Sequence, residues 1–306
     1  MHSYSVNDLE LELFATEVRM DVIDMLYKAG SGHTGGSLSC TDILVSLYHP
    51  KHGIMKHDPK NPKWEERDRF ILSAGHKAPA LYAILAKCGY FPREKLYTLR
   101  KINSILQGHV FTNTPGVEAQ AGSLGQGLSI ANGVTMALRL KKVDSMVYCL
   151  LGDGEINEGQ IWEAAKNASY HKLGNVCAII DHNGERIDGI TWEIYPIRKK
   201  WEAFGWYVIG EEVKWTEDRK EMELDGHDYN FLTNAFKEAK ERRNDNQPTA
   251  VIVNTIKSKG IPMMENVVGS HGRAPNKIEY EDGMRYLKEK AEKLKVKLYE
   301  FELRAG

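Results

Sequence analysis

Residues 152–189 read GDGEINEGQIWEAAKNASYHKLGNVCAIIDHNGERIDG, and this stretch decides the fold that the rest of the chain is expected to adopt. The nearly continuous apolar run before it, at 145–151, is typical of a parallel strand that is covered on both faces. An acidic helix is expected over 158–171, and a second buried strand over 176–181. Two strands joined by a helix form a βαβ unit, so both strands should end at the same edge of a parallel sheet.

Polar residues follow each of these two strands. Asp153 lies between two glycines after the first strand, and Asn183 follows the second. Because parallel strands place their carboxyl ends together, the two side chains are expected to meet. A carboxylate and an amide oxygen suit Mg²⁺ or Ca²⁺ better than zinc, and the backbone carbonyl of Glu185 is a further candidate ligand. Since Mg²⁺ usually keeps phosphate oxygens among its ligands, the stretch predicts a metal-assisted diphosphate site.

The composition limits the classes of protein that fit this prediction. A chain of 306 residues with 42% hydrophobic content can bury the core of one large α/β domain, expected over 1–306. A formal net charge of -1 leaves no positive surplus for nucleic acid or an anionic membrane, so neither partner is expected. No stretch has the length and apolarity of a membrane span, and the acidic N-terminus is unlike a signal or transit peptide.

The cysteines carry no sign of a metal or disulfide framework. They lack CxxC spacing and are expected to be buried thiols in a reducing cytoplasm. The four positions are Cys40, Cys88, Cys149 and Cys177.

Histidines in glycine-containing loops are the next candidates for function. A single histidine is more often structural than catalytic, but glycines let the backbone approach a ligand closely. Four of the 11 histidines each lie in a glycine-containing loop: His33, His76, His109 and His271. Three others have no such support and are expected to be structural: His171, His182 and His227. A further glycine-rich loop, 116–127, leads into a helix expected over 128–141, an arrangement that brings bare backbone to a ligand or serves ordinary tight packing.

The remaining elements continue the α/β pattern. Segment 31–40 is expected to be a loop, 211–224 an exposed insertion, and 279–303 a C-terminal helix that packs on the domain or on a partner. Other helices are expected over 7–29, from Thr41 to before Pro50, and over 78–86, 196–204 and 229–243; other strands over 67–73, 206–209 and 249–254.

Taken together, these motifs resemble transketolase, a thiamine-diphosphate enzyme family, over nearly the whole chain. GDG at 152–154 with DHN at 181–183 matches the motif shared by the wider thiamine-diphosphate superfamily. The motifs that point to transketolase within it are SGHTGG, RDRFILSAGH, the GH at 108–109, TPGVEAQAGSLGQGLS, IDG, and the late KSKG and GSHGRAP. The resemblance implies the N-terminal part of a transketolase, a parallel α/β domain with helices on both faces and a PP-type thiamine diphosphate site.

The resemblance also implies a cofactor site for thiamine diphosphate and Mg²⁺, with Ca²⁺ as a possible substitute. The metal would be held by Asp153, Asn183 and the carbonyl of Glu185. Ser123 departs from the proline that the family usually has beside the aminopyrimidine. The implied cofactor-binding residues are His76, Gly122, Ser123, Leu124, Asp153, Gly154, Asn183 and His271.

Catalytic roles follow from the resemblance as well. His33, His109 and His271 match positions that face the thiazolium and the sugar, where neutral imidazoles orient hydroxyls and move protons. Glu158 and Glu163 match interface carboxylates that link two active sites in this family.

The resemblance covers only the diphosphate-binding part of a transketolase. We therefore expect this chain to be the N-terminal subunit of a two-chain enzyme, with a separate C-terminal subunit that carries the pyrimidine-binding domain, in an α₂β₂ assembly. The expected reaction transfers a two-carbon ketol group from a ketose, usually phosphorylated, to an aldose. Two alternatives stay open: a deoxyxylulose-phosphate-synthase-like or 2-oxoacid decarboxylating enzyme subunit, and a non-catalytic regulatory subunit that binds thiamine diphosphate.

Overall fold

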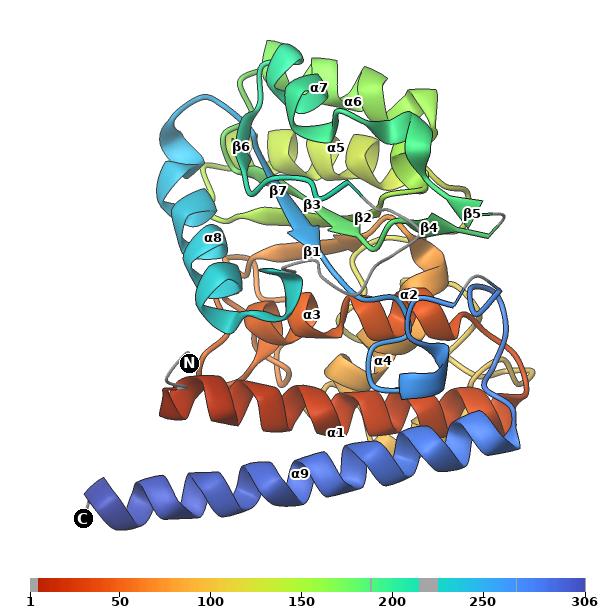
Figure 1. Ribbon diagram of the computed structural model, residues 1–306. Helices are drawn as coiled ribbons and strands as arrows, with labels where there is room; N and C mark the ends of the chain where they lie inside the picture. Colours follow the sequence, from red (N-terminus) through yellow and green to blue (C-terminus); the bar gives the residue numbers. More distant parts are fainter. Residues whose placement is uncertain (1–4, 188, 215–224, 268, 306) are drawn as a thin grey trace.

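Five parallel strands form the central sheet, in the order β1-β2-β3-β7-β6 (Figure 1). The computed structural model describes residues 5–187, 189–214, 225–267 and 269–305. The residues of the four strands other than β6 are all buried, as expected for strands covered on both faces. The strands are β1 (Arg69–Leu72), β2 (Val147–Gly152), β3 (Val176–His182), β6 (Tyr207–Ile209) and β7 (Thr249–Asn254).

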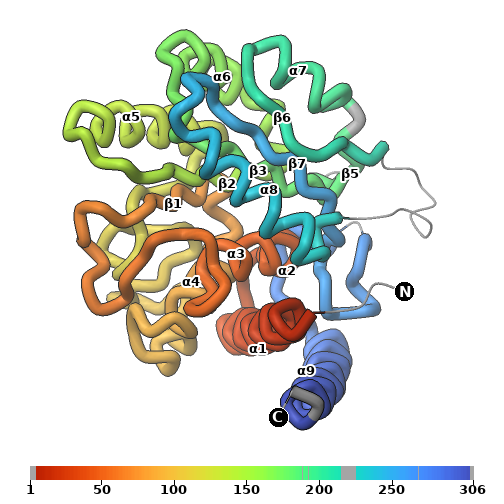
Figure 2. The backbone as a smooth tube through the Cα atoms, turned by 90° about the vertical axis from the view of Figure 1, so that its left-hand side faces the viewer, coloured from red at the N-terminus to blue at the C-terminus, as the bar shows by residue number. Residues whose placement is uncertain are grey.

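Helices cover both faces of this sheet (Figures 1 and 2). Successive strand residues point to opposite faces, so Tyr148 and Leu150 join one hydrophobic cluster while Cys149 and Leu151 join the other. The first face is covered by α3 (Thr41–Tyr48), α4 (Ala78–Lys87) and α8 (Tyr229–Glu241); the second by α5 (Gln126–Leu140), α6 (Gly159–Tyr170) and α7 (Ile197–Ala203). The predicted α/β class, with a parallel sheet and helices on both faces, is confirmed.

Two long helices form an outer layer next to α3 and α4. Helix α1 (Val6–Ala29) begins with a capping box between Ser5 and Asp8 and ends at Gly30, whose φ of 62° suits glycine. Helix α9 (Lys277–Ala305) packs along the outside of α1 (Figure 2) and includes the range 279–303 where a helix was expected. None of the helices in the described ranges combines the length and apolar composition needed to cross a bilayer.

The expectation of a loop over 31–40 is wrong in part. Residues 34–39 form a short helix, α2 (Thr34–Ser39), and His33 lies at its N-cap. The glycines of this segment serve close packing between elements: a Cβ on Gly35 would lie 2.9 Å from the Lys257 side chain, and one on Gly36 3.3 Å from that of Lys77. Sequence periodicity could not reveal this helix, because tertiary contacts and not local propensity stabilise so short a segment.

The predicted insertion, 211–224, falls largely outside the described residues. Its first four residues are described and are exposed or half-buried, and 215–224 lie beyond the described ranges.

A buried charge network ties α1 to α3 and α8. The Arg19 guanidinium forms two hydrogen bonds with Asp42, of 3.0 and 2.6 Å. Tyr229 donates to the same carboxylate at 2.7 Å. His227 accepts the Ile256 backbone N–H at Nε2, so its Nδ1 carries the proton and donates to Asp42 at 2.6 Å. Burial lowers the pKa of His227, which keeps the ring neutral in this network.

We predict that Asp42→Asn lowers the free energy of unfolding by about 3–5 kcal/mol, because it leaves the Arg19 charge buried without its partner. The control is Asp24→Asn on α1, where the partner Lys28 is exposed and asparagine keeps an oxygen for the Tyr280 hydroxyl; it is expected to cost only about 0.3–0.5 kcal/mol. Urea unfolding of both variants measures the difference. Equal losses in the two variants would contradict the importance of the buried network.

Candidate functional site

The candidate site lies at the carboxyl edge of the sheet, where the polar residues of the central strands come together. Parallel pairing sets Gly152 opposite Asp181 and His182 opposite Asn254. Asp153 therefore follows β2 at the point where Asn183 follows β3, as the βαβ pattern predicted. A two-stranded antiparallel hairpin, β4 (Glu185–Arg186) with β5 (Gly189–Ile190), continues from β3 beside this edge.

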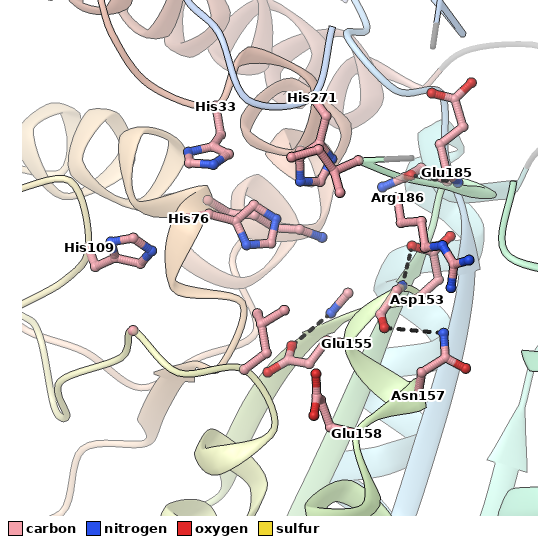
Figure 3. A pocket seen from close by; sticks show the side chains of 18 residues that line it. His33, His76, His109, Asp153, Glu155, Asn157, Glu158, Glu185, Arg186 and His271 are labelled. Atoms are coloured by element: carbon pink, nitrogen blue, oxygen red, sulfur yellow. Dashed lines mark hydrogen bonds between the residues drawn. The ribbon is translucent and has the colours of Figure 1, made fainter. Parts of the chain in front are cut away.

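One cavity of about 540 Å³ opens at this edge (Figure 3). It is lined by all but two of the predicted site residues: His33, His76, His109, Gly122, Leu124, Asp153, Gly154, Glu158, Asn183, Glu185 and His271. Ser123 instead lines an adjoining cavity of about 520 Å³, together with Gly122 and His109. Glu163 is exposed on α6 and does not reach the cavity.

The Asp153 carboxylate is buried at one end of the cavity. It accepts backbone N–H hydrogen bonds from Gly154 at 2.8 Å and Gly184 at 2.5 Å, and it forms no ion pair within the described residues. Burial raises the pKa of this carboxyl. A buried carboxylate without a cationic partner is costly, and a bound divalent cation would remove that cost. The residue therefore fits the metal ligand that the sequence predicted.

Asn183 and Glu185 lie next to this carboxylate. The side-chain oxygen of Asn183 accepts the Glu185 N–H at 3.2 Å, and the Glu185 carboxylate turns away to pair with the buried Lys257 at 3.2 Å. Across the described ranges no three His, Cys, Asp or Glu side chains gather as an all-protein metal site would require. One carboxylate with amide and carbonyl oxygens suits an ion that takes its other ligands from phosphate and water, as Mg²⁺ does.

Three histidine rings cluster in the middle of the cavity (Figure 3). The ring centroid of His33 lies 5.2 Å from that of His76 and 5.7 Å from that of His271, and His76 lies 5.3 Å from His271. His109 lies on the far side of His33, at 6.4 Å. The Nδ1 atoms of His33 and His271 are buried and make no hydrogen bond to any described residue. The rings of both residues line the cavity, so its wall contains two buried polar atoms that no described residue satisfies.

The surroundings keep these imidazoles neutral. Burial lowers the pKa of His33 to about 4 and that of His271 to about 3, and it holds the pKa of His76 well below its usual range. The Arg100 guanidinium contributes further to the lowered pKa of His33 and of His109. At pH 7 all four rings can act as hydrogen-bond acceptors or bases.

Sequence reasoning missed two buried charged residues of the site. Lys77, which lines the cavity next to His76, is bound through Nζ to Asp181 at the end of β3. Glu155, three residues after Gly152, is only 2% exposed and accepts hydrogen bonds from several loops. The available signal was position alone, because Lys77 directly follows His76 and Glu155 directly follows Gly154. Lysine and glutamate are usually exposed, so a buried role was not expected for either residue.

Comparison with known proteins identifies the family of the chain. Residues 11–293 match the family model described as "Transketolase, thiamine diphosphate binding domain". A 6-deoxy-6-sulfo-D-fructose transketolase subunit from Clostridium sp. (strain MSTE9) is 40% identical over 271 residues, which are 87% of this chain and 92% of the relative. An apulose-4-phosphate transketolase subunit from Phocaeicola vulgatus is 38% identical over 287 residues, which are 93% of this chain and 96% of the relative.

A solved transketolase structure is also similar to this chain. The crystal structure of transketolase from Campylobacter jejuni superposes with a TM-score of 0.80 at 34% identity, covering 92% of this chain and 42% of that one. The chain thus spans less than half of that transketolase, but nearly the full length of the two relatives named as subunits. The match over residues 11–293 and these relatives show that the chain belongs to the transketolase family and carries its thiamine diphosphate binding domain.

Proposed function

We propose that this chain is the N-terminal, cofactor-binding subunit of a two-chain transketolase, which transfers a two-carbon ketol group from a ketose or ketose phosphate to an aldose or aldose phosphate. The observation that carries the proposal is that the buried Asp153 carboxylate and a cluster of neutral histidines line the same cavity. The relatives with similar length are named as transketolase subunits, which supports the two-chain form.

Each end of the cavity has a role in this proposal. Asp153, Asn183 and the Glu185 carbonyl would hold Mg²⁺ against the diphosphate of the cofactor, with Gly154 in backbone contact. Leu124 and Gly122 would meet the aminopyrimidine, and Ser123 lies at the edge of that contact because it faces the adjoining cavity. Bound thiamine diphosphate supplies the carbon nucleophile and electron sink of ketol transfer.

The histidines of this chain would bind and orient the sugar. His33 and His271 line the cavity, and a neutral imidazole offers one hydrogen-bond donor and one acceptor, so each ring would bind a substrate hydroxyl through a nitrogen that faces the cavity. His109, 6.4 Å from His33, would contact the far end of a sugar, and His76, 5.3 Å from His271, would lie near the diphosphate end. As neutral imidazoles near pH 7, these groups can move protons between hydroxyl and carbonyl oxygens.

A C-terminal subunit with a pyrimidine-binding domain is the proposed partner, in an α₂β₂ assembly with Glu158 and Glu163 at the contact between active sites. Glu163 is exposed on α6 and Glu158 is exposed at the cavity rim, so both are accessible to another subunit. The free thiols of all four cysteines support a reducing cytoplasm as the location.

Reconstitution tests the proposal. The chain is purified and mixed with a pyrimidine-domain subunit of the same genome, and ketol transfer is followed with a ketose phosphate donor and an aldose acceptor. Activity is expected only with both subunits, thiamine diphosphate and Mg²⁺. Full activity of the chain alone would refute the two-chain arrangement, and turnover of pyruvate in place of the ketose would refute ketol transfer.

Asp153→Asn should weaken binding of thiamine diphosphate about 10- to 100-fold in the presence of Mg²⁺, the loss expected when one charged interaction is removed. The cofactor-free variant should be at least as stable as the unchanged chain, because it no longer buries a carboxylate without a cation. Calorimetric titration and urea unfolding measure the two effects.

The matched control is Asp68→Asn, since Asp68 is also buried and also accepts two backbone N–H groups, from Lys56 and Met146. This control should lose stability and keep its cofactor affinity. An Asp153→Asn variant that binds the cofactor normally would contradict the metal assignment.

The lowered histidine pKa values predict a loss of stability in acid. The folded pKa values of His33 (about 4) and His271 (about 3) lie below the ordinary value of 6.5, so the unfolded chain binds more protons between these pH limits. This contribution to stability is complete above pH 6.5 and is lost as the pH falls toward 4 for His33 and toward 3 for His271. The double variant His33→Asn, His271→Asn should therefore show a shallower decline of unfolding free energy, whereas His171→Asn, at an exposed position, should not. Equal slopes in all three proteins would contradict the neutral cluster.

A further inference from the structure

Glu155 lines the cavity, and its buried carboxylate binds three separate loops. Its Oε1 accepts the Ser73 hydroxyl at 2.5 Å and the Gly125 N–H at 2.9 Å. Its Oε2 accepts the Gly152 N–H at 3.1 Å. These donors come from the end of β1, the start of α5 and the end of β2. One side chain thus holds three loops that surround the cavity.

Glu155 and Ser73 together accept hydrogen bonds from the free backbone N–H groups at the start of α5. The N-cap residue of this helix is Gly125, which has no side chain to bind the free N–H groups of the first turn. The carboxylate takes the N–H of Gly125, and the Ser73 hydroxyl takes that of Gly127 at 3.1 Å. A negative charge is favourable at a helix N-terminus, so Glu155 acts as a cap supplied from another part of the chain.

Glycine makes these close contacts possible. Gly125 has a φ of 84°, which favours glycine, and a Cβ at this position would lie 2.9 Å from Cβ of Glu158. A Cβ on Gly127 would lie 2.3 Å from Cβ of Ser73. The start of α5 therefore packs closely against Ser73 at the end of β1 and against Glu158 at the start of α6.

The three bound loops carry opposite ends of the proposed cofactor site. Gly152 directly precedes Asp153 at the diphosphate end, and Gly125 directly follows Leu124 at the aminopyrimidine end. Ser73 leads into the turn that carries His76. One carboxylate therefore connects the diphosphate end, the aminopyrimidine end and the histidine turn of the site.

We propose that Glu155 is a positioning residue that sets the spacing between the diphosphate end of the cofactor site at Asp153 and the aminopyrimidine end at Gly122–Leu124. The proposal rests on the proposed function, because it concerns the same thiamine diphosphate. It assigns to Glu155 no contact with substrate or cofactor. It predicts that only a ligand that spans both loops depends on this carboxylate.

Glu155→Gln tests this directly in the full chain. Glutamine has the same size, but its amide nitrogen must face one of the three donors, so one loop contact is lost. Thiamine diphosphate with Mg²⁺ should bind at least about tenfold more weakly than to the unchanged chain, the scale of one charged hydrogen bond. Inorganic pyrophosphate with Mg²⁺ contacts only the Asp153 end and should bind within about twofold of normal. Asp68→Asn, a buried carboxylate that accepts other backbone N–H groups, should change neither affinity.

The outcomes separate the possible roles. A Glu155→Gln variant that weakens both ligands equally, or neither, overturns the positioning role. An unchanged chain that binds neither ligand instead overturns the proposed cofactor function. Should Glu155→Gln fail to fold, Ser73→Ala decides, because it keeps the carboxylate and removes one bridge to α5. It should also weaken thiamine diphosphate and spare pyrophosphate, and an equal effect on both, or none, overturns the proposal.

Discussion

The buried pair between Lys77 and Asp181 is the interaction on which the candidate site depends. The side chains are 1% and 0% exposed, and the carboxylate also accepts hydrogen bonds from Ser39 at 2.6 Å and from Thr255. Burial alone would lower the pKa of Lys77, but Asp181 raises it, so the ammonium stays charged. Four segments meet here: α2, the start of α4, and the ends of β3 and β7. Because loss of one partner from such a pair costs about 3–5 kcal/mol, the floor of the cavity is fixed before any ligand binds.

Asp181 and Asp153 are two buried carboxylates at the ends of the neighbouring strands β3 and β2, and they have different hydrogen-bond partners. Asp181 is bound by an ammonium and two hydroxyls, whereas Asp153 has only two backbone N–H groups among the described residues. The first arrangement stabilises the fold, and the second leaves negative charge for a cation to neutralise. This contrast supports the proposal of a metal at Asp153. The Lys77 ammonium pairs with Asp181 and not with Asp153, so this ion pair leaves the Asp153 carboxylate free to bind a cation.

The sequence predicted those features that depend on local pattern. Apolar runs of the right length revealed β2, β3 and β7, and parallel pairing then brought Asp153 and Asn183 together. Glycine-containing loops singled out the four histidines that line the cavity. Lys77 and Glu155 could not be found in this way, since their partners lie far away in sequence and charged residues are normally exposed. Helix α2 was missed for a related reason, because its glycines mark packing against two buried lysines and not a free loop.

The central claim is that the carboxyl edge of the sheet at Asp153 anchors the metal and diphosphate of thiamine diphosphate. Crystals of the chain grown with thiamine diphosphate and Mn²⁺, as an anomalous scatterer in place of Mg²⁺, test it most directly. The account predicts an anomalous peak at about 2.1 Å from an Asp153 carboxylate oxygen and from the Asn183 side-chain oxygen, with diphosphate oxygens completing the coordination. A peak elsewhere in the cavity, or a diphosphate bound at the histidine end with no metal at Asp153, would contradict it.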